Sequence, residues 1–107
     1  MRLCDLQREV GVWSLHNFGA EPAYRKLLGV GEELGELCHA HLKGEQGIRG
    51  FSAETKSAKE DAIGDLIIYL ADYCDKSGID LDHAVEKTWA LVSQRDWKQH
   101  PKDGISE

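Results

Sequence analysis

The chain has 107 residues, 19 of them acidic and 13 basic, and a formal net charge of −6. A chain of this length is expected to form a single domain over residues 1–107, with a small core that a partner subunit would enlarge. The acidic balance argues against binding to a nucleic-acid polymer or to a membrane surface, because both require a basic face. The three cysteines are widely spaced, which argues against a disulfide framework and favours the reducing cytoplasm.

Helices are predicted along the whole chain, and no segment carries a strand pattern. Apolar residues at three- and four-residue spacing predict a first helix over residues 3–17. Pro22 suits the first turn of a second helix, which we expect to continue to Lys43 and to stop at Gly44. A glycine-rich loop then leads to a third helix over residues 53–77.

The last third of the chain predicts one more helix. Gly78 suits the left-handed position that ends the third helix, and Asp80 can cap the fourth. The fourth helix is expected to reach about Trp97, followed by a polar, frayed tail from residue 100. Four amphipathic helices with short connections predict an all-α fold, a four-helix bundle.

The second helix gathers its acids on one side. At about 100° per residue, Glu32, Glu33 and Glu36 fall within one sector of about 100°. The apolar side chains of the helix, among them Leu34 and Leu37, occupy the neighbouring sector. Glu33 is the acid nearest this apolar stripe.

The third helix repeats the pattern with Asp61, Asp65 and Asp72. If the two helices pack together, the acidic columns meet, and like charges about 4 Å apart repel by about 4 kcal/mol at an effective dielectric constant of about 20. Lysines, bound protons or divalent cations could compensate. Since lysines are not interleaved on these arcs, we expect a cation, and carboxylate oxygens suit Mg²⁺ or Mn²⁺. The plain alternative is two acidic helix faces that point into solvent.

Four motifs in this order resemble one family, the all-α nucleoside triphosphate pyrophosphohydrolases of the MazG type. The family pattern, E-E-x-x-E followed by E-x-x-D, matches E-E-L-G-E at residues 32–36 and D-A-I-G-D at residues 61–65, with 24 residues between Glu36 and Asp61. The chain is also similar to small phage-type members in G-V-W-S-L-H-N-F-G, H-L-K-G-E-Q-G-I-R and K-T-W-A-L-V-S-Q-R-D-W. Ala62 stands where the family usually has a glutamate, and Asp61 supplies an acid one residue earlier.

The resemblance implies metal-dependent hydrolysis of nucleoside triphosphates, here tilted towards deoxynucleotides, between the α and β phosphorus atoms. The products are a nucleoside monophosphate and pyrophosphate, as nucleotide-pool control or the supply of a modified-DNA nucleotide would require. Mg²⁺, with Mn²⁺ as a substitute, would be held by Glu33, Glu36, Asp61 and Asp65. Glu32 would be a further ligand or the base that takes a proton from water.

The resemblance also suggests how the substrate is held and how the chain assembles. Lys87 and Arg95, two turns apart on the predicted fourth helix, and Arg49 in the glycine-rich loop would bind the phosphates. Trp13 and Asn17, one helical turn apart, would stack on the base and read its edge. We expect a homodimer or homotetramer in the cytoplasm, or in the host cytoplasm for a phage protein.

Two other functions stay open on the sequence. Glu36 and His39 form an E-x-x-H motif of the kind that holds iron in di-iron bundles, although the third helix offers no histidine. Alternatively, Ala62 marks a decayed active site in a bundle that binds nucleotides or a protein partner without turnover.

Overall fold

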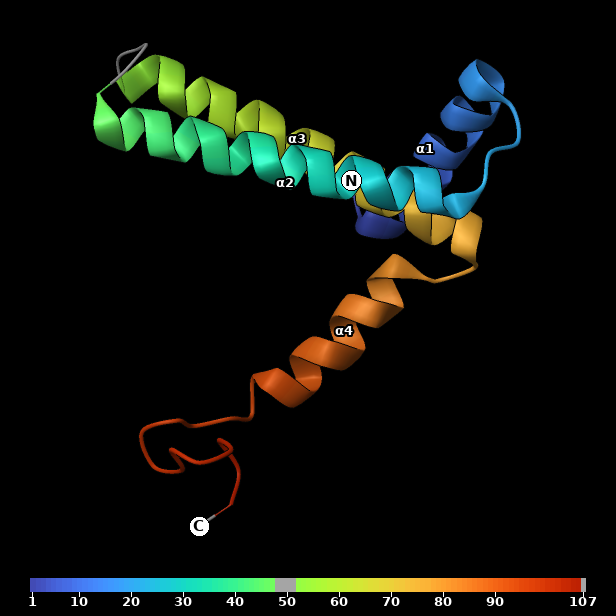
Figure 1. Cartoon of the computed structure of the whole chain (residues 1–107). Helices are drawn as coiled ribbons and strands as arrows, with labels where there is room; N and C mark the ends of the chain where they lie inside the picture. The colour runs from blue at the N-terminus through green and yellow to red at the C-terminus, as the bar shows by residue number, and fades with distance from the viewer. Residues whose placement is uncertain (48–51, 107) are drawn as a thin grey trace.

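The computed structural model of the chain describes residues 1–47 and 52–106, and it is helical (Figure 1). The helices are α1 (Leu3–Phe18), α2 (Ala23–Gln46), α3 (Ser52–Ser77) and α4 (Leu81–Val92). Within the described residues there is no strand, so the predicted all-α class is confirmed. None of the helices is both long enough and apolar enough to cross a membrane.

The boundary between α3 and α4 is confirmed, whereas the predicted end of α2 is wrong. Gly78 has a φ of 70° after α3, and the Asp80 side chain caps α4 by accepting from the backbone N–H of His83 at 3.0 Å. However, α2 does not stop at Gly44 but runs to Gln46 and ends at Gly47, which has a φ of 70°. Gly44 stays helical because it packs closely on α3, where an added Cβ would lie 2.5 Å from Thr55 Cγ2.

The C-terminal segment also departs from the prediction. Helix α4 ends at Val92, five residues before the expected Trp97, and turns follow it. The predicted frayed tail is wrong, because the segment is closed by its own hydrogen bonds: the Asp96 N–H donates to the Gly104 carbonyl at 2.8 Å. The Asp96 side chain accepts from the backbone N–H groups of Lys98 and Gln99, which holds the segment after the helix end.

Helices α2 and α3 form a long antiparallel hairpin, which is the largest packing unit of the chain (Figure 1). Its register is set by three facing pairs: Lys26 with Asp72, Gly29 with Tyr69, and Glu33 with Asp65. The residue numbers of each pair add to 98, as expected for two antiparallel helices in continuous register. The first and last pairs are seven residues, or about 10 Å, apart along the seam between α2 and α3, and the Gly29–Tyr69 pair lies between them.

The remaining two helices gather at one end of this hairpin. Ala71 and Cys74 of α3 and Leu81 at the start of α4 form a buried cluster, with Leu3 and Leu6 of α1 packed against it. The Gln7 side chain joins α1 to the α3–α4 connection by donating to the Ile79 carbonyl at 2.6 Å and accepting from the Leu81 N–H. Helix α4 then extends away from the hairpin (Figure 1). One chain therefore supplies the four helices of the expected bundle without closing them around a common core.

The close packing of α2 on α3 leaves no room for a side chain at Gly29, and Gly31 of the same helix provides a matched control. A Cβ at position 29 would lie 2.4 Å from Tyr69 Cδ1, whereas a Cβ at position 31 meets nothing within 4 Å. We expect Gly29→Ala to lower the free energy of unfolding by about 1–3 kcal/mol through overpacking. Gly31→Ala should raise it by about 0.5–1 kcal/mol, because alanine favours the helix. Urea unfolding of both variants checks this, and equal effects of the two substitutions would contradict the described register.

Candidate metal centre

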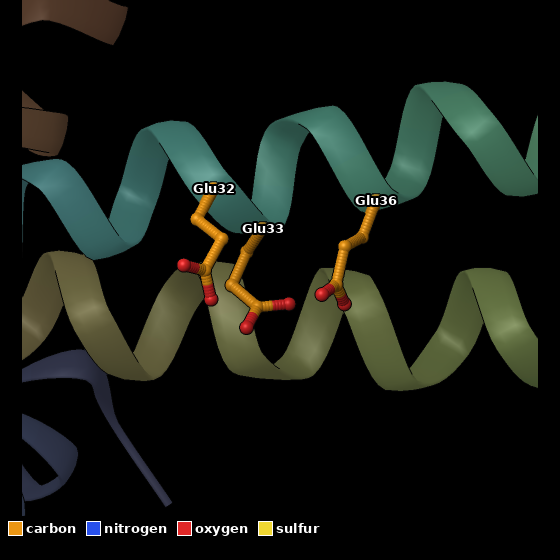
Figure 2. A group of neighbouring side chains, drawn as sticks. All are labelled: Glu32, Glu33 and Glu36. Atoms are coloured by element: carbon orange, nitrogen blue, oxygen red, sulfur yellow. The ribbon is translucent and has the colours of Figure 1, made fainter.

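Three glutamate side chains converge on the α3-facing side of α2. Glu32, Glu33 and Glu36 each offer a carboxylate oxygen, and these oxygens lie within 4.8 Å of one another. Figure 2 shows the three side chains extending from α2 towards α3. Opposite oxygens around an octahedral Mg²⁺ ion lie about 4 Å apart, so small side-chain movements would bring this group to a cation's coordination shell.

Glu33 is the buried member of the group. Its side chain is packed in the seam, with 7% of the residue exposed, and Oε2 has no hydrogen-bond partner. Burial raises the pKa of its carboxyl group, and the nearby negative charges of Glu36, Asp65 and Glu32 raise it further. A buried carboxylate in this position is costly unless a proton or a cation neutralises it.

The predicted aspartates of α3 differ in how they lie relative to the α2 glutamates. Asp65 faces Glu33 and contributes to its raised pKa. Asp61 lies one turn earlier on the same side of α3. Both aspartates are exposed, and neither is part of the tight group formed by the α2 glutamates. Ala62 is buried, with 4% exposed, and the register places it opposite Glu36. The family's usual glutamate would therefore enter the seam directly across from Glu36.

Asp72, which the sequence groups with the other two α3 aspartates, belongs to a different site. Its carboxylate is buried and bound by two lysines: Lys76 Nζ donates to Oδ1 at 2.6 Å, and Lys26 Nζ lies 3.7 Å from Oδ2. The prediction that no lysine compensates these acidic columns is thus wrong for this end of the seam. Sequence reasoning missed Lys26, although it precedes Glu33 by seven residues and so shares its helix face.

The seam therefore contains two charged layers, and only one of them has basic side chains that neutralise its acids. At Asp72 the chain supplies its own ammonium groups, whereas no lysine or arginine within the described residues forms an ion pair with Glu32, Glu33 or Glu36. The carboxylate layer consists of oxygen donors, which suits Mg²⁺ or Mn²⁺. No histidine joins the metal-capable group in the described part of the chain, so the E-x-x-H pair of Glu36 and His39 gains no support as an iron site.

The predicted phosphate-binding residues lie away from this centre in a single chain. Lys87 is exposed on α4, which extends away from the hairpin, and Arg95 lies beyond the end of α4 (Figure 1). The expected arrangement of Lys87 and Arg95 two turns apart on one helix face is therefore wrong. The Arg95 side chain packs instead over Gly104. Arg49 lies outside the described residues.

The predicted base-binding pair lies on α1. Trp13 is half exposed and packs edge-on against Phe18, with ring centroids 5.6 Å apart, so it does not fill the core. The Asn17 amide donates to the Trp13 carbonyl at 2.8 Å, so in this conformation it bonds to its own helix. Phe18 also lies beneath the Lys26 ammonium, 4.4 Å from the ring centroid, which links this end of α1 to the seam.

Comparisons with protein-family models, with curated proteins and with solved structures find no match to the chain.

The buried Glu33 carboxyl predicts a characteristic dependence of stability on pH. Because its pKa is raised on folding, the folded state holds this proton at higher pH than the unfolded state does. Its contribution to stability is present below the ordinary glutamate pKa and is lost as the pH rises through the raised value. In metal-free buffer at pH 7, Glu33→Gln should therefore melt at a higher temperature than the parent protein.

Glu32→Gln is the matched control, because Glu32 is an exposed neighbour on the same helix. Melting curves from pH 4 to pH 8 should show a smaller loss of stability in Glu33→Gln than in the parent or in Glu32→Gln. A Glu33→Gln protein that melts below the parent across this range would show that the charged carboxylate is satisfied within the chain.

Proposed function

We propose that the chain is a metal-dependent nucleoside triphosphate pyrophosphohydrolase of the MazG type. The observation that carries the proposal is the buried Glu33 carboxylate, which has an unpartnered oxygen and three further acids around it. A small domain has about 5–15 kcal/mol of total stability, so an uncompensated buried acid is retained at a substantial cost. Binding a divalent cation offsets that cost and gives the cluster a chemical use.

The proposed reaction adds water across the bond between the α phosphorus and the bridging oxygen to the β phosphorus. The products are a nucleoside monophosphate, pyrophosphate and a proton. Glu33, Glu36, Asp61 and Asp65 would hold Mg²⁺, which supplies charge neutralisation at the phosphates and a more acidic water. Glu32 lies beside this group and is exposed, so its carboxylate is available as a further ligand or as the base for the water proton.

The substrate class follows from the same resemblance. Trp13 presents an exposed indole that a base can stack on, and Lys87 and Arg95 are the proposed phosphate contacts. Deoxynucleoside triphosphates are the preferred substrates in this proposal, in nucleotide-pool control or in the supply of a monophosphate for modified DNA. In one chain Trp13 lies on α1 while Lys87 and Arg95 lie in the C-terminal third. The complete site would therefore form in an oligomer.

A homo-oligomer is supported by the surface that one chain leaves exposed. The chain exposes 8041 Å², whereas a compact monomer of 12.0 kDa exposes about 6,000 Å². Its radius of gyration is 17.5 Å, against about 13 Å for a compact domain of this length. Burying the excess of about 2,000 Å² on each of two copies falls in the range of obligate homodimers.

The apolar face available for this contact lies on the hairpin, on the side turned away from the acids. Leu34 and Ile63 are each about half exposed there, at 51% and 49%. By helical spacing the face comprises Leu27, Val30, Leu34 and Leu37 of α2 and Ile63 and Leu66 of α3. Two hairpins packed through it would form a four-helix bundle with the carboxylate layers on its outer sides.

The second candidate function, nucleotide binding without turnover, rests on Ala62. Because this residue is buried opposite Glu36, a glutamate here would add a carboxylate to the layer. In an inactive binding module, Ala62→Glu should create turnover that the parent lacks. In an active enzyme the parent already hydrolyses its substrate.

Product analysis tests the hydrolase directly. With Mg²⁺ and a panel of ribo- and deoxynucleoside triphosphates, the protein should yield monophosphate and pyrophosphate. Asp65→Asn and Glu36→Gln should abolish turnover while circular dichroism shows unchanged helix content, and Glu60→Gln, an exposed acid on α3, should retain it. Diphosphate and phosphate as products, or full activity in either site variant, would contradict the proposal.

Light scattering coupled to size exclusion tests the hairpin interface. The parent should have a mass of at least twice 12.0 kDa, and Leu34→Glu should be monomeric, because it places a charge at the centre of the apolar face. Ile105→Glu, a change at a more exposed apolar residue of the C-terminal segment, serves as the control and should stay oligomeric. A monomeric parent would refute the interface.

A further inference from the structure

The second charged layer of the seam is a buried network around Asp72. It joins α1, α2 and α3. Lys26 of α2 lies 3.2 Å from Glu21 Oε1 and 3.7 Å from Asp72 Oδ2. Lys76 donates to Asp72 at 2.6 Å and to Ser14 of α1 at 3.0 Å. Asp72 is only 3% exposed, and Ser14 is fully buried. Arg25 also pairs with Glu21, at 3.3 Å, so the chain's own basic groups compensate both acids.

We propose that Asp72 is a positioning residue for the metal centre: by pairing with Lys26 it fixes the axial register of α2 against α3, and so the apposition of Glu33 and Asp65. This inference rests on the proposed function for the metal centre, and the register it describes can be measured without a metal. Lys26 precedes Glu33, and Asp72 follows Asp65, by seven residues, so the two layers are about 10 Å apart on the same faces. Because the same two helices carry both layers, a shift of α3 along α2 at Asp72 also shifts Asp65 relative to Glu33.

The carboxylate layer cannot set this register by itself. If α3 slipped by one turn in one direction, Asp61 would replace Asp65 opposite Glu33, and the layer would again contain facing acids. The same slip would leave the Lys26 ammonium facing Ile68. A slip in the other direction would place Lys76 opposite Lys26, which is repulsive. Only the observed register gives the buried Lys26 a carboxylate from α3 in addition to the local Glu21, and either slip breaks this contact across the seam.

The network also ties α1 to the seam. Ser14 is next to Trp13, and its hydroxyl accepts from Lys76, while the Lys26 ammonium lies over the Phe18 ring at the end of α1. Gly29 and Tyr69 pack between the two layers, and the Tyr69 ring centroid is 5.8 Å from Lys26 Nζ. The same pairing thus sets the position of the helix that carries the proposed base contacts relative to the carboxylates.

The experiment compares three proteins with the parent. Asp72→Asn removes the charge. The triple variant Lys26→Met, Asp72→Leu, Lys76→Met replaces three of the ionic groups by apolar ones and leaves Glu21 paired with Arg25. Such a replacement is often neutral or stabilising, which separates loss of register from loss of folding. Glu60→Gln, an exposed acid on the same helix, is the control.

Two readouts are taken. Spin labels at Gly35→Cys and Gly64→Cys report the register, because added side chains meet nothing within 4 Å at either site. Cys4 and Cys38 are replaced by serine for this purpose. Titration with Mn²⁺ gives the metal dissociation constant of the folded protein. The parent and Glu60→Gln should give one narrow label distance and the same dissociation constant.

Asp72→Asn and the triple variant should broaden or displace the label distance, because α3 can then shift along α2 by about one helical turn, 5 Å. They should weaken Mn²⁺ binding by about 10- to 100-fold, as for residues that orient metal ligands. A label distance that is unchanged in both variants overturns the inference, as does parental Mn²⁺ affinity in a folded triple variant. A parent that binds no Mn²⁺ refutes the proposed function and the role of Asp72 towards a metal, while its label distances still decide the register.

Discussion

The burial of one carboxylate between two antiparallel helices is the constraint on which the rest of this structure depends. Glu33 lies inside the α2–α3 seam, and one of its oxygens has no partner in the described part of the chain. An apolar residue there would give a more stable hairpin, since burying an acid without a partner lowers the free energy of unfolding. The sequence keeps an acid and adds Glu36 and Asp65 beside it, which raise its pKa further. This arrangement favours binding of a proton or a cation over stability of the empty protein.

The same seam also contains a buried acid that is paired with basic groups of the chain. Asp72 sits two turns from Asp65 on the same helix, is as deeply buried as Glu33, and is held by Lys26 and Lys76. One sequence therefore neutralises one buried acid internally and leaves the other open. The difference between the layers, rather than the mere presence of acidic residues, supports a metal centre, because solvated acidic helix faces are common.

Much of the fold could be predicted from periodicity and capping residues, because these are local signals. Gly78 and Asp80 mark helix ends through backbone geometry that depends on the nearest residues. The prediction that α2 stops at Gly44 failed because this glycine is needed for close contact with Thr55 of α3, a tertiary contact that local sequence rules do not include. The length of α4 was overestimated because the amphipathic pattern continues into residues that the structure folds into turns.

The candidate site divides in a similar way. Helical spacing predicts that Glu32, Glu33 and Glu36 share a face, and the structure brings their carboxylates together. The spacing also placed Asp72 with the other aspartates, because a helical wheel has no information on the partner helix that supplies Lys26. The relation of Lys87 and Arg95 to the carboxylates depends on tertiary and quaternary packing, so a pattern along one helix could not predict it.

Calorimetric titration of the metal-free protein with Mn²⁺ at mildly acidic pH tests the central claim most directly. In buffers of different ionisation enthalpy it reports both binding and the protons released. If the cation binds at the Glu33 carboxyl, Mn²⁺ binding should release a proton from the parent protein. Glu33→Gln should not bind Mn²⁺, whereas Glu32→Gln should release a proton on binding as the parent does. Absence of binding in the parent, or equal binding and proton release in Glu33→Gln, would contradict the account.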